Sequence, residues 1–569
     1  MSKSLFRKKS IDKIIQDAET GLGDGHEPGG LKKVLNVRDL TFMGIAAVVG
    51  AGIFSTIGTA AFNGGPGISL LFVITAVTCG FSALCYAEFA SRVPIAGSAY
   101  TYAYVSFGEL VAWIIGWALI LEYAIGNIVV AISWSGYFNN LLEGFGLHLP
   151  AWLTTDPGTA ANAFQKAQEA VAAGNPLTES LQFAQQAWNT APVIAGKHIF
   201  VNLPAFIIVC LISALTYIGI KESKKMTNFL VVFKILVIIF VIIMGFFFVQ
   251  PSNWSPFMPN GFEGVLKGVS AVFYAYIGFD AISTTAEECR NPQRDLPRGM
   301  IYSLIICTVL YILIAFVLTG MVPFTELKVA DPLAFVFDRV GQKWIGYIVS
   351  ISAVVATTSV LLVFQLGQPR IWMSMSRDGL LPKAFGKIHP KYQTPWFSTI
   401  VTGIMVAVPS LFMESSLMTD LTSIGTLFAF VLVSGGVLTL PRIANLKGEA
   451  NPTGKFKLPY INGKYIVPLL YAVFVFFSRQ RIVSSLQHVS SEGLQEILFL
   501  VFILLSTVLS VLTFLRNYSI IPILGVLFCA YLLIEIPAVS WIYFFVWMAL
   551  GLSIYFLYGY RKSRLAAGS

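Results

Sequence analysis

The sequence predicts an all-α membrane protein that crosses the bilayer twelve to fourteen times. Hydrophobic residues make up 56% of the 569 residues and charged residues only 12%, whereas a soluble domain carries roughly 25% charged residues. The apolar residues also gather in windows of about twenty, the length that a helix needs to cross a bilayer. Both observations exclude a soluble globular protein.

The apolar windows place fourteen helices along the chain. They lie near residues 40–64, 68–93, 106–140, 199–219, 226–250, 263–289, 298–322, 347–376, 396–413, 420–446, 465–480, 493–515, 518–535 and 538–560. The third and eighth windows are long, which implies tilted helices. Segment 323–344 is too polar to span the bilayer, and we expect an outside loop with a short amphipathic helix there.

The distribution of Lys and Arg predicts the orientation. The formal net charge is +9, but the positive residues stand between the apolar windows, so nucleic-acid binding is not needed to explain them. With the N-terminus in the cytoplasm, the inside loops hold the dense basic clusters at 221–225, 290–298 and 377–391. The positive-inside rule then puts the basic tail 1–39 and the short tail 561–569 in the cytoplasm of a plasma-membrane protein.

Cysteine and histidine give no sign of a metal site, a cofactor or an enzyme. The six cysteines lie in or at the ends of apolar windows, and no spacing suggests a metal site or a disulfide framework. The five histidines lie in loops, at interfaces or in the tail. No convergent set of catalytic side chains appears, as an enzyme would require.

Two windows are interrupted by glycine. Segment 45–58 contains Gly50-Ala51-Gly52, and segment 269–290 contains Gly278-Phe279-Asp280. Non-helical backbone at membrane depth is tolerated only where protein or trapped water satisfies its polar groups. Interrupted helices at corresponding places in two halves of a chain indicate the binding site of a transporter.

The windows divide into two halves of five, 40–250 and 263–446, and each half opens with a broken helix. Because five is odd, the second half enters the membrane from the opposite side. The sequence therefore predicts a five-plus-five inverted repeat in which the first and sixth helices are discontinuous. Residues 447–560 then add further helices.

A polar insertion at 148–198 interrupts the first half. It is rich in Ala, Gln, Asn and Thr, and helical spacing appears at 160–173 and 179–188. We expect a small helical hairpin over the outer mouth, and we leave open whether it has a function.

The broken helices could bind a zwitterion. Backbone N–H groups at the start of the resumed first helix suit a carboxylate, because unpaired donors and the helix dipole both favour negative charge there. Carbonyls freed at both breaks suit an ammonium group. The candidate donors are Ala51, Gly52 and Ile53, and the candidate acceptors are Val48, Tyr274, Ala275 and Ile277. Alternatively, the glycines only allow close helix packing, but two such breaks in a repeat favour a site.

Lys234 and Glu122 are ionisable residues deep in apolar windows. Lys234 lies nine residues past Lys225, about 13 Å along a helix, and so near the centre of a core about 30 Å thick. A lysine there can take up and release a proton near neutral pH, replace a coupling sodium ion, or bond carbonyls permanently. Glu122 could be a relay partner, a cation-selecting group or a structural anchor. We expect Asp280 to cap the broken helix.

Several long strings resemble the amino acid–polyamine–organocation superfamily, and within it the cationic amino acid transporter group. They include VVGAGIF (48–54), YAEFASRVPIAGSAYTYAYVSFGE (86–109), LEYAIGNIVVAISWSGYF (121–138), GIKESKKMTN (219–228), AYIGFDAISTTAEECRNPQRDLPRG (275–299) and MSRDGLLP (375–382). The resemblance implies the five-plus-five fold and secondary transport of amino acids by alternating access.

The resemblance also implies roles for single residues. Lys234 matches the fifth-helix lysine that stands where sodium-coupled relatives bind sodium, which implies proton coupling. Glu122 and Tyr123 match the Glu-Tyr pair at the cavity of this group. The sequence departs from the family pattern at Ala51, in the insertion, and in an added helix pair at 465–515.

The function expected from the sequence is proton-coupled symport of an amino acid across the plasma membrane. The alternatives are an amino acid exchanger without proton coupling and a non-transporting amino acid sensor. Phe273, Phe279 and Phe364 favour neutral or small aliphatic substrates over Arg or Lys. Whether an accessory protein binds is left open.

Overall fold

The computed structural model describes residues 5–9, 31, 33–172, 179–194, 196–329, 331–440, 456–492 and 494–567. Within these residues, nine helices are long and apolar enough to cross a membrane, and three shorter helices are apolar as well. The sheet formed by these residues is small, pairing β1 (Val193–Ile194) with β2 (Lys197–His198). The all-α polytopic fold is therefore confirmed.

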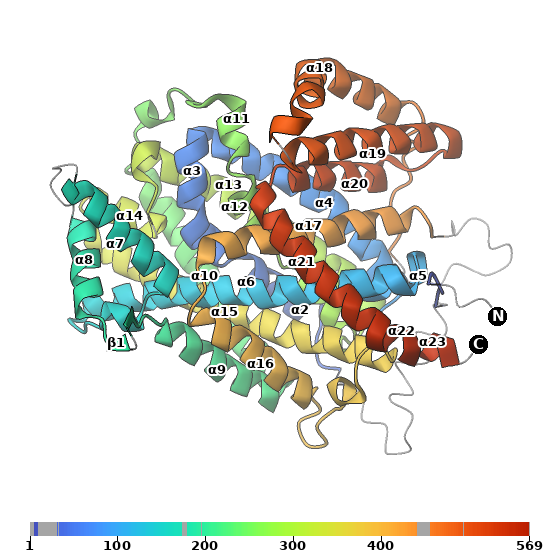
Figure 1. The fold of residues 1–569 in the computed structure, drawn as a ribbon, viewed down its shortest axis with the longest axis horizontal. Helices are drawn as coiled ribbons and strands as arrows, with labels where there is room; N and C mark the ends of the chain where they lie inside the picture. The colour runs from blue at the N-terminus through green and yellow to red at the C-terminus, as the bar shows by residue number, and fades with distance from the viewer. Residues whose placement is uncertain are drawn as a thin grey trace.

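Each expected window contains a helix, and Figure 1 shows these helices as one bundle. The first half contains α2 (Val37–Val48), η1 (Gly52–Thr56), α3 (Ile57–Gly64), α4 (Ile68–Arg92), α6 (Glu109–Gly144), α9 (Leu203–Ile218) and α10 (Ile220–Phe246). The second half contains α11 (Gly261–Leu266), α12 (Val269–Tyr274), η5 (Phe279–Glu288), α13 (Pro292–Met321), α15 (Lys343–Arg377), α16 (Trp396–Ser410) and α17 (Ser415–Val437). After these come α18 (Ile466–Glu492), α19 (Leu494–Arg516), α20 (Ile520–Ile534) and α21 (Ala538–Ile554).

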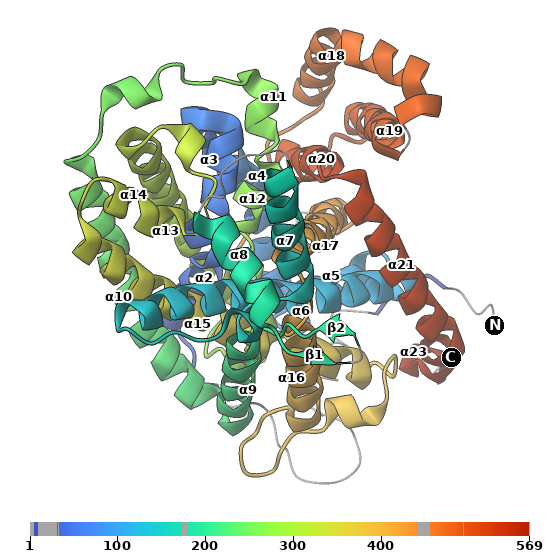
Figure 2. The same ribbon diagram turned by 60° about the vertical axis from the view of Figure 1, so that its left-hand side comes forward.

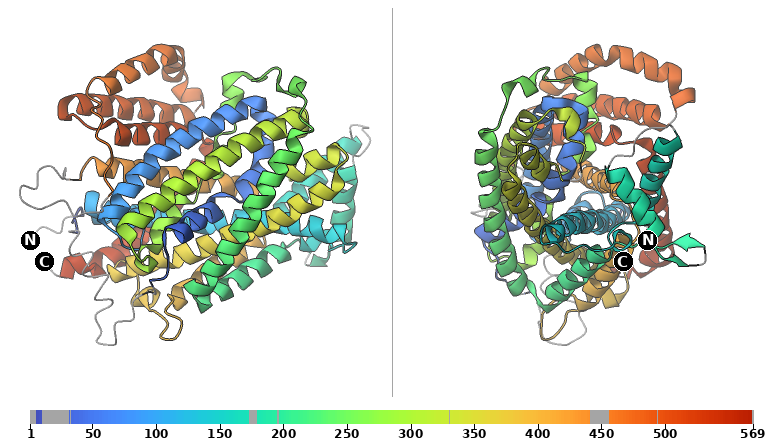
Figure 3. Two further views of the ribbon diagram at one scale, coloured as in Figure 1. Left: turned by 180° about the vertical axis from the view of Figure 1, so that it is seen from behind. Right: turned by 90° about the vertical axis from the view of Figure 1, so that its left-hand side faces the viewer.

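The centre of the bundle is formed by α6 and α15, the two longest helices, which pack against each other. Helices α18 and α19 lie at the side of the bundle, away from this centre (Figure 2). Seen from behind, α4 and α13 run next to each other across the bundle (Figure 3).

A helical hairpin and a short amphipathic helix lie at one end of the bundle, which we call the hairpin end. Helices α7 (Pro157–Ala172) and α8 (Glu179–Thr190) pack together, and the Trp188 ring stacks on Phe164 at 4.8 Å and on Phe200 at 5.5 Å. The expected helical hairpin is confirmed. The expected amphipathic helix in 323–344 is present as α14 (Pro332–Arg339).

The opposite end, which we call the terminal end, holds residues 5–9 and the C-terminal helices α22 (Tyr560–Lys562) and α23 (Arg564–Ala567). The short helix α5 (Ala99–Ser106) also lies there and leads into α6.

The eleventh helix is longer than expected, because α18 continues from the predicted end near residue 480 to Glu492. One polar residue of this extension, Arg481, has partners on neighbouring elements. Arg481 lies 4.4 Å above the Phe499 ring of α19 and pairs with Glu535 at 3.0 Å. These contacts stabilise a helix that an apolar window does not detect.

The two broken helices pack antiparallel. The first part of one helix, α2, contacts the second part of the other, η5, while η1 and α3 contact α12. Gly278 faces Ala47, Gly52 faces Ala275 and Gly64 faces Val265, so the pairs run in reverse order. This direction agrees with the expected inverted repeat.

Gly52 allows the closest of these approaches. A Cβ atom placed on Gly52 would lie 2.3 Å from the Cα atom of Ala275, so any side chain pushes the broken helices apart. We predict that Gly52→Ala lowers the melting temperature in detergent by several degrees, because overpacking a filled core costs about 1–3 kcal/mol.

Gly80→Ala is the matched control for this prediction. Gly80 lies inside α4 and its Cβ would meet no atom within 4 Å. A glycine replaced by alanine inside a helix stabilises the helix by up to about 1 kcal/mol. Equal melting temperatures for the two variants would contradict the close packing at Gly52.

Candidate functional site

The first broken helix unwinds between Val48 and Gly52. Val49 has an extended backbone (φ −82°, ψ 94°), and the chain resumes as one turn of π-helix from Gly52. The N–H group of Ile53, one of the expected carboxylate donors, donates to the Gly50 carbonyl at 3.1 Å.

The carbonyl groups at the end of α2 have polar partners from other helices. Lys234 Nζ, fully buried, donates to the carbonyls of Ala46 at 3.1 Å and Val49 at 2.8 Å, and to Ser359 Oγ at 2.8 Å. The ammonium group thus caps the last turn, where orphan carbonyls and the negative end of the helix dipole favour a cation.

Tyr311 of α13 provides a further bond, because its hydroxyl donates to the Val48 carbonyl at 2.7 Å. Sequence reasoning identified Lys234 but missed Tyr311 and Ser359. Both are hydroxyl residues in apolar windows, a weak signal that many structural Ser and Tyr residues share.

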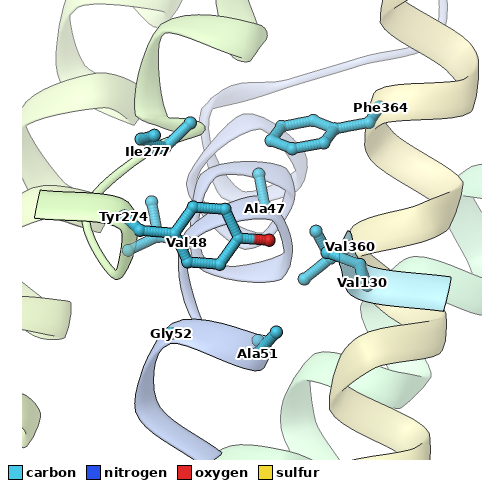
Figure 4. Close-up of a pocket in the computed structure, with 10 residues that line it drawn as sticks. Ala47, Val48, Ala51, Gly52, Val130, Tyr274, Ile277, Val360 and Phe364 are labelled. Atoms are coloured by element: carbon cyan, nitrogen blue, oxygen red, sulfur yellow. The ribbon is translucent and has the colours of Figure 1, made fainter. Parts of the chain in front are cut away.

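A small cavity lies between the two breaks (Figure 4). Its volume is about 10 Å³, room for roughly one water molecule. It is lined by Ala47, Val48, Gly50, Ala51, Gly52, Val130, Tyr274, Ile277, Val360 and Phe364. The cavity in this conformation is therefore too small to hold an amino acid.

Five of the eight expected binding residues line this cavity, namely Val48, Ala51, Gly52, Tyr274 and Ile277. The other three lie in the adjoining layer. Ala275 packs against Gly52, Ile53 follows Gly52, and the Tyr123 ring contacts the Phe364 ring at 5.3 Å between centroids.

The cavity also has two walls that the sequence did not predict. Val130 comes from α6, and Val360 comes from α15, which also carries Phe364. The Tyr274 and Phe364 rings both face the cavity in Figure 4. Of the three phenylalanines considered from the sequence, Phe364 lines the cavity, whereas Phe273 and Phe279 pack against Phe430.

A buried acidic cluster contains Glu122 and Asp280, each 1% exposed. Glu122 lies next to Thr426, and the two carboxyl groups are near enough to repel each other. Asp280 is the second residue of η5, but neither of its carboxylate oxygens has a hydrogen-bond partner among the described residues, so the expected cap on the broken helix is not formed. Tyr86, next to Phe279 at 6.3 Å, is close to both acids.

Two ion pairs connect the end of η5 with α15. Glu288, 1% exposed, accepts two bonds from Arg370 at 2.8 and 2.5 Å. Glu287 accepts two bonds from Arg377 at 2.7 and 2.9 Å. We call these two pairs the terminal gate. The sequence shows the acidic residues, but their partners are more than eighty residues away along the chain.

Comparison with known proteins identifies the family. The family described as "Amino acid permease" matches residues 35–504, and a second family, described as "C-terminus of AA_permease", matches residues 518–563.

Two relatives are similar to this chain over nearly its whole length, and a third is similar over part of it. The chain is 38% identical over 566 residues to the branched-chain amino acid permease BcaP of Bacillus subtilis, covering 99% of this chain and 100% of the relative. It is 36% identical over 563 residues to the methylthioribose transporter of the same organism, covering 99% of each. It is also 36% identical over 446 residues to the vacuolar cationic amino acid transporter 4 of Arabidopsis thaliana, covering 77% of this chain and 67% of the relative. With its motifs, helices and relatives in agreement, this chain belongs to the amino acid permease family of the amino acid–polyamine–organocation superfamily.

Proposed function

We propose that this permease takes up neutral amino acids with aliphatic side chains across the plasma membrane, together with protons and by alternating access. The observation that carries the proposal is the apolar cavity between the two broken helices, next to the carbonyl groups that Lys234 caps. In this proposal both termini lie in the cytoplasm, because the basic clusters at 290–298 and 377–391 stand at that end. The terminal gate is then the inner gate.

The substrate backbone would lie across the breaks. Its carboxylate would face the N–H groups of Ala51 and Gly52 at the positive end of the resumed helix. Its ammonium group would face the carbonyls of Val48 and Tyr274. A carbonyl oxygen accepts two hydrogen bonds, so the bond from Tyr311 to Val48 leaves one position for the substrate.

The cavity walls favour an aliphatic side chain. Val130, Val360 and Ile277 are aliphatic, and Glu122 is not among the lining residues. Burying the charge of a lysine or arginine side chain without a paired carboxylate would be costly. The similarity to a branched-chain amino acid permease supports the same substrate class.

Lys234 offers a way to couple transport to protons. In the charged form its three donors hold the end of α2 against α10 and α15. Without the proton it has one donor fewer and no charge, so the capped carbonyls are held less strongly. Protonation would therefore control the shape of the break that binds the substrate.

We predict that Lys234→Met abolishes accumulation of leucine driven by an inward proton gradient in proteoliposomes, because Met keeps the apolar length but donates no hydrogen bond. Lys267→Ala is the control, since that side chain is 66% exposed, and it should transport like the parent chain. If uptake in both variants requires amino acid inside the proteoliposomes and does not respond to the proton gradient, the protein is instead an exchanger.

Phe364 should set the size of the accepted side chain. Replacing it with alanine enlarges the cavity, so we predict that Phe364→Ala raises the kcat/KM ratio for phenylalanine over valine by about tenfold, a typical scale for discrimination in an apolar pocket. Competition for labelled valine uptake measures the change. Phe477→Ala removes a ring that is 80% exposed on α18 and should leave the ratio unchanged. An unchanged ratio in Phe364→Ala would place the side-chain pocket elsewhere.

A further inference from the structure

Residues 5–9 cross the terminal end of the bundle as a turn at Leu5 and Phe6 followed by Arg7–Lys9 without regular secondary structure, and we call this segment the strap. Its backbone caps α6, because the N–H groups of Glu109 and Leu110 donate to the carbonyls of Arg7 at 3.0 Å and Leu5 at 3.1 Å. Lys8 is exposed, whereas its neighbours Arg7 and Lys9 are more buried. Arg7 and Lys9 therefore face the protein, while Lys8 between them faces outward.

Each inward-facing cation of the strap pairs with a carboxylate of the bundle. We call the surroundings of each of these carboxylates an acidic socket. Arg7 pairs at 3.2 Å with Glu109, whose side chain is fully buried. Lys9, 7% exposed, pairs at 2.7 Å with Asp378, the residue directly after α15. A buried carboxylate that loses its cation is left uncompensated, which is unfavourable. The sockets are therefore suited to two cations spaced two residues apart.

The other walls of the sockets come from three parts of the chain. Glu109 also accepts hydrogen bonds from Tyr104 of α5 at 2.9 Å, and from Tyr555 at 2.9 Å and Ser563 at 2.5 Å near the C-terminus. Asp378 accepts a bond from Tyr100 of α5 at 2.6 Å.

The strap also packs directly against the backbone of Gly108. A Cβ atom on Gly108 would lie 2.6 Å from the carbonyl carbon of Phe6, and Gly108 has a φ of +100°, which glycine adopts readily. Glycine is therefore the residue that fits between the strap and α6.

The sockets are connected to the terminal gate. Asp378 follows Arg377, the gate residue that holds Glu287. The loop before α5 joins the same network, because the Ala96 N–H donates to Glu287 at 3.2 Å and Ser374 of α15 donates to the Ala96 carbonyl at 2.7 Å. Movement of the end of α15 away from η5 would thus disturb both the gate and the Asp378 socket.

We propose that the terminal end holds a binding site for an extended basic peptide, occupied here by the strap, and that its occupancy favours the closed terminal gate. This proposal depends on the alternating access proposed above in one respect: the terminal gate must be able to open. Emptying the site shifts the population toward molecules with an open gate.

Cys289 reports on the gate. It directly follows Glu288 and is fully buried, so a thiol reagent reaches it slowly in the closed state. In a chain whose other cysteines are replaced by serine, maleimide labelling of Cys289 is measured in detergent. We expect Arg7→Gln combined with Lys9→Gln to raise the labelling rate at least threefold, while Lys8→Gln leaves it unchanged.

Adding a synthetic peptide with the sequence of residues 1–10 to a chain that lacks residues 1–9 should restore slow labelling, and the same peptide with glutamine at positions 7 and 9 should not. Failure of the first peptide, or equal effects of both, would overturn the peptide site.

A second reporter distinguishes gate opening from unfolding. Cys79 is fully buried in the middle of α4, and a chain with Cys79 as its single cysteine should label at the same slow rate with and without the strap cations. A rise at Cys79 equal to that at Cys289, or no rise at Cys289, would refute the link to the gate. Labelling needs neither substrate nor a proton gradient, so this result is independent of the proposed transport function.

Discussion

The structure depends on the satisfaction of backbone carbonyls in the middle of an apolar bundle. In a bilayer, each unpaired carbonyl is costly because no bulk water can solvate it. The break after Val48 frees such groups, and Lys234 and Tyr311 pair with three of them. An ammonium group has three donors and no acceptor, so Lys234 is well matched to a site that contains only acceptors. The broken helix is stable here because Lys234 and Tyr311 satisfy its freed carbonyl groups.

The cap also explains the arrangement around the break. With one side of α2 held by α10 and α15, the other side is free to meet the second broken helix, and glycines at positions 52 and 278 allow their backbones to approach. Two breaks side by side and antiparallel place the positive end of one half-helix near freed carbonyls of the other. This arrangement suits a zwitterion, whereas a single break would offer only half of it.

The sequence predicted what depends on local composition. Apolar windows located the helices, glycines located both breaks, and Lys234, which the sequence places deep in its helix, is fully buried in the bundle. It did not predict which helices face the breaks: Tyr311 and Val360 come from distant windows that are apolar on every side, so periodicity does not reveal the rotation of these helices. The second half of α18 was missed because it is polar, and the contacts of Arg481 with α19 and with Glu535 next to α20 cannot be read from an apolar window.

In the proposed mechanism, the terminal gate uses buried ion pairs where apolar contacts would also close the path. A buried pair such as Glu288–Arg370 adds little net stability over well-packed apolar side chains, because both charges must be desolvated. The ion pair and an apolar contact differ in how they behave when the gate opens. Separated apolar surfaces remain unfavourable in water, whereas separated charges regain their hydration. A gate of paired charges can therefore exclude water when closed, with two bonds per arginine, and still open at modest cost once water enters.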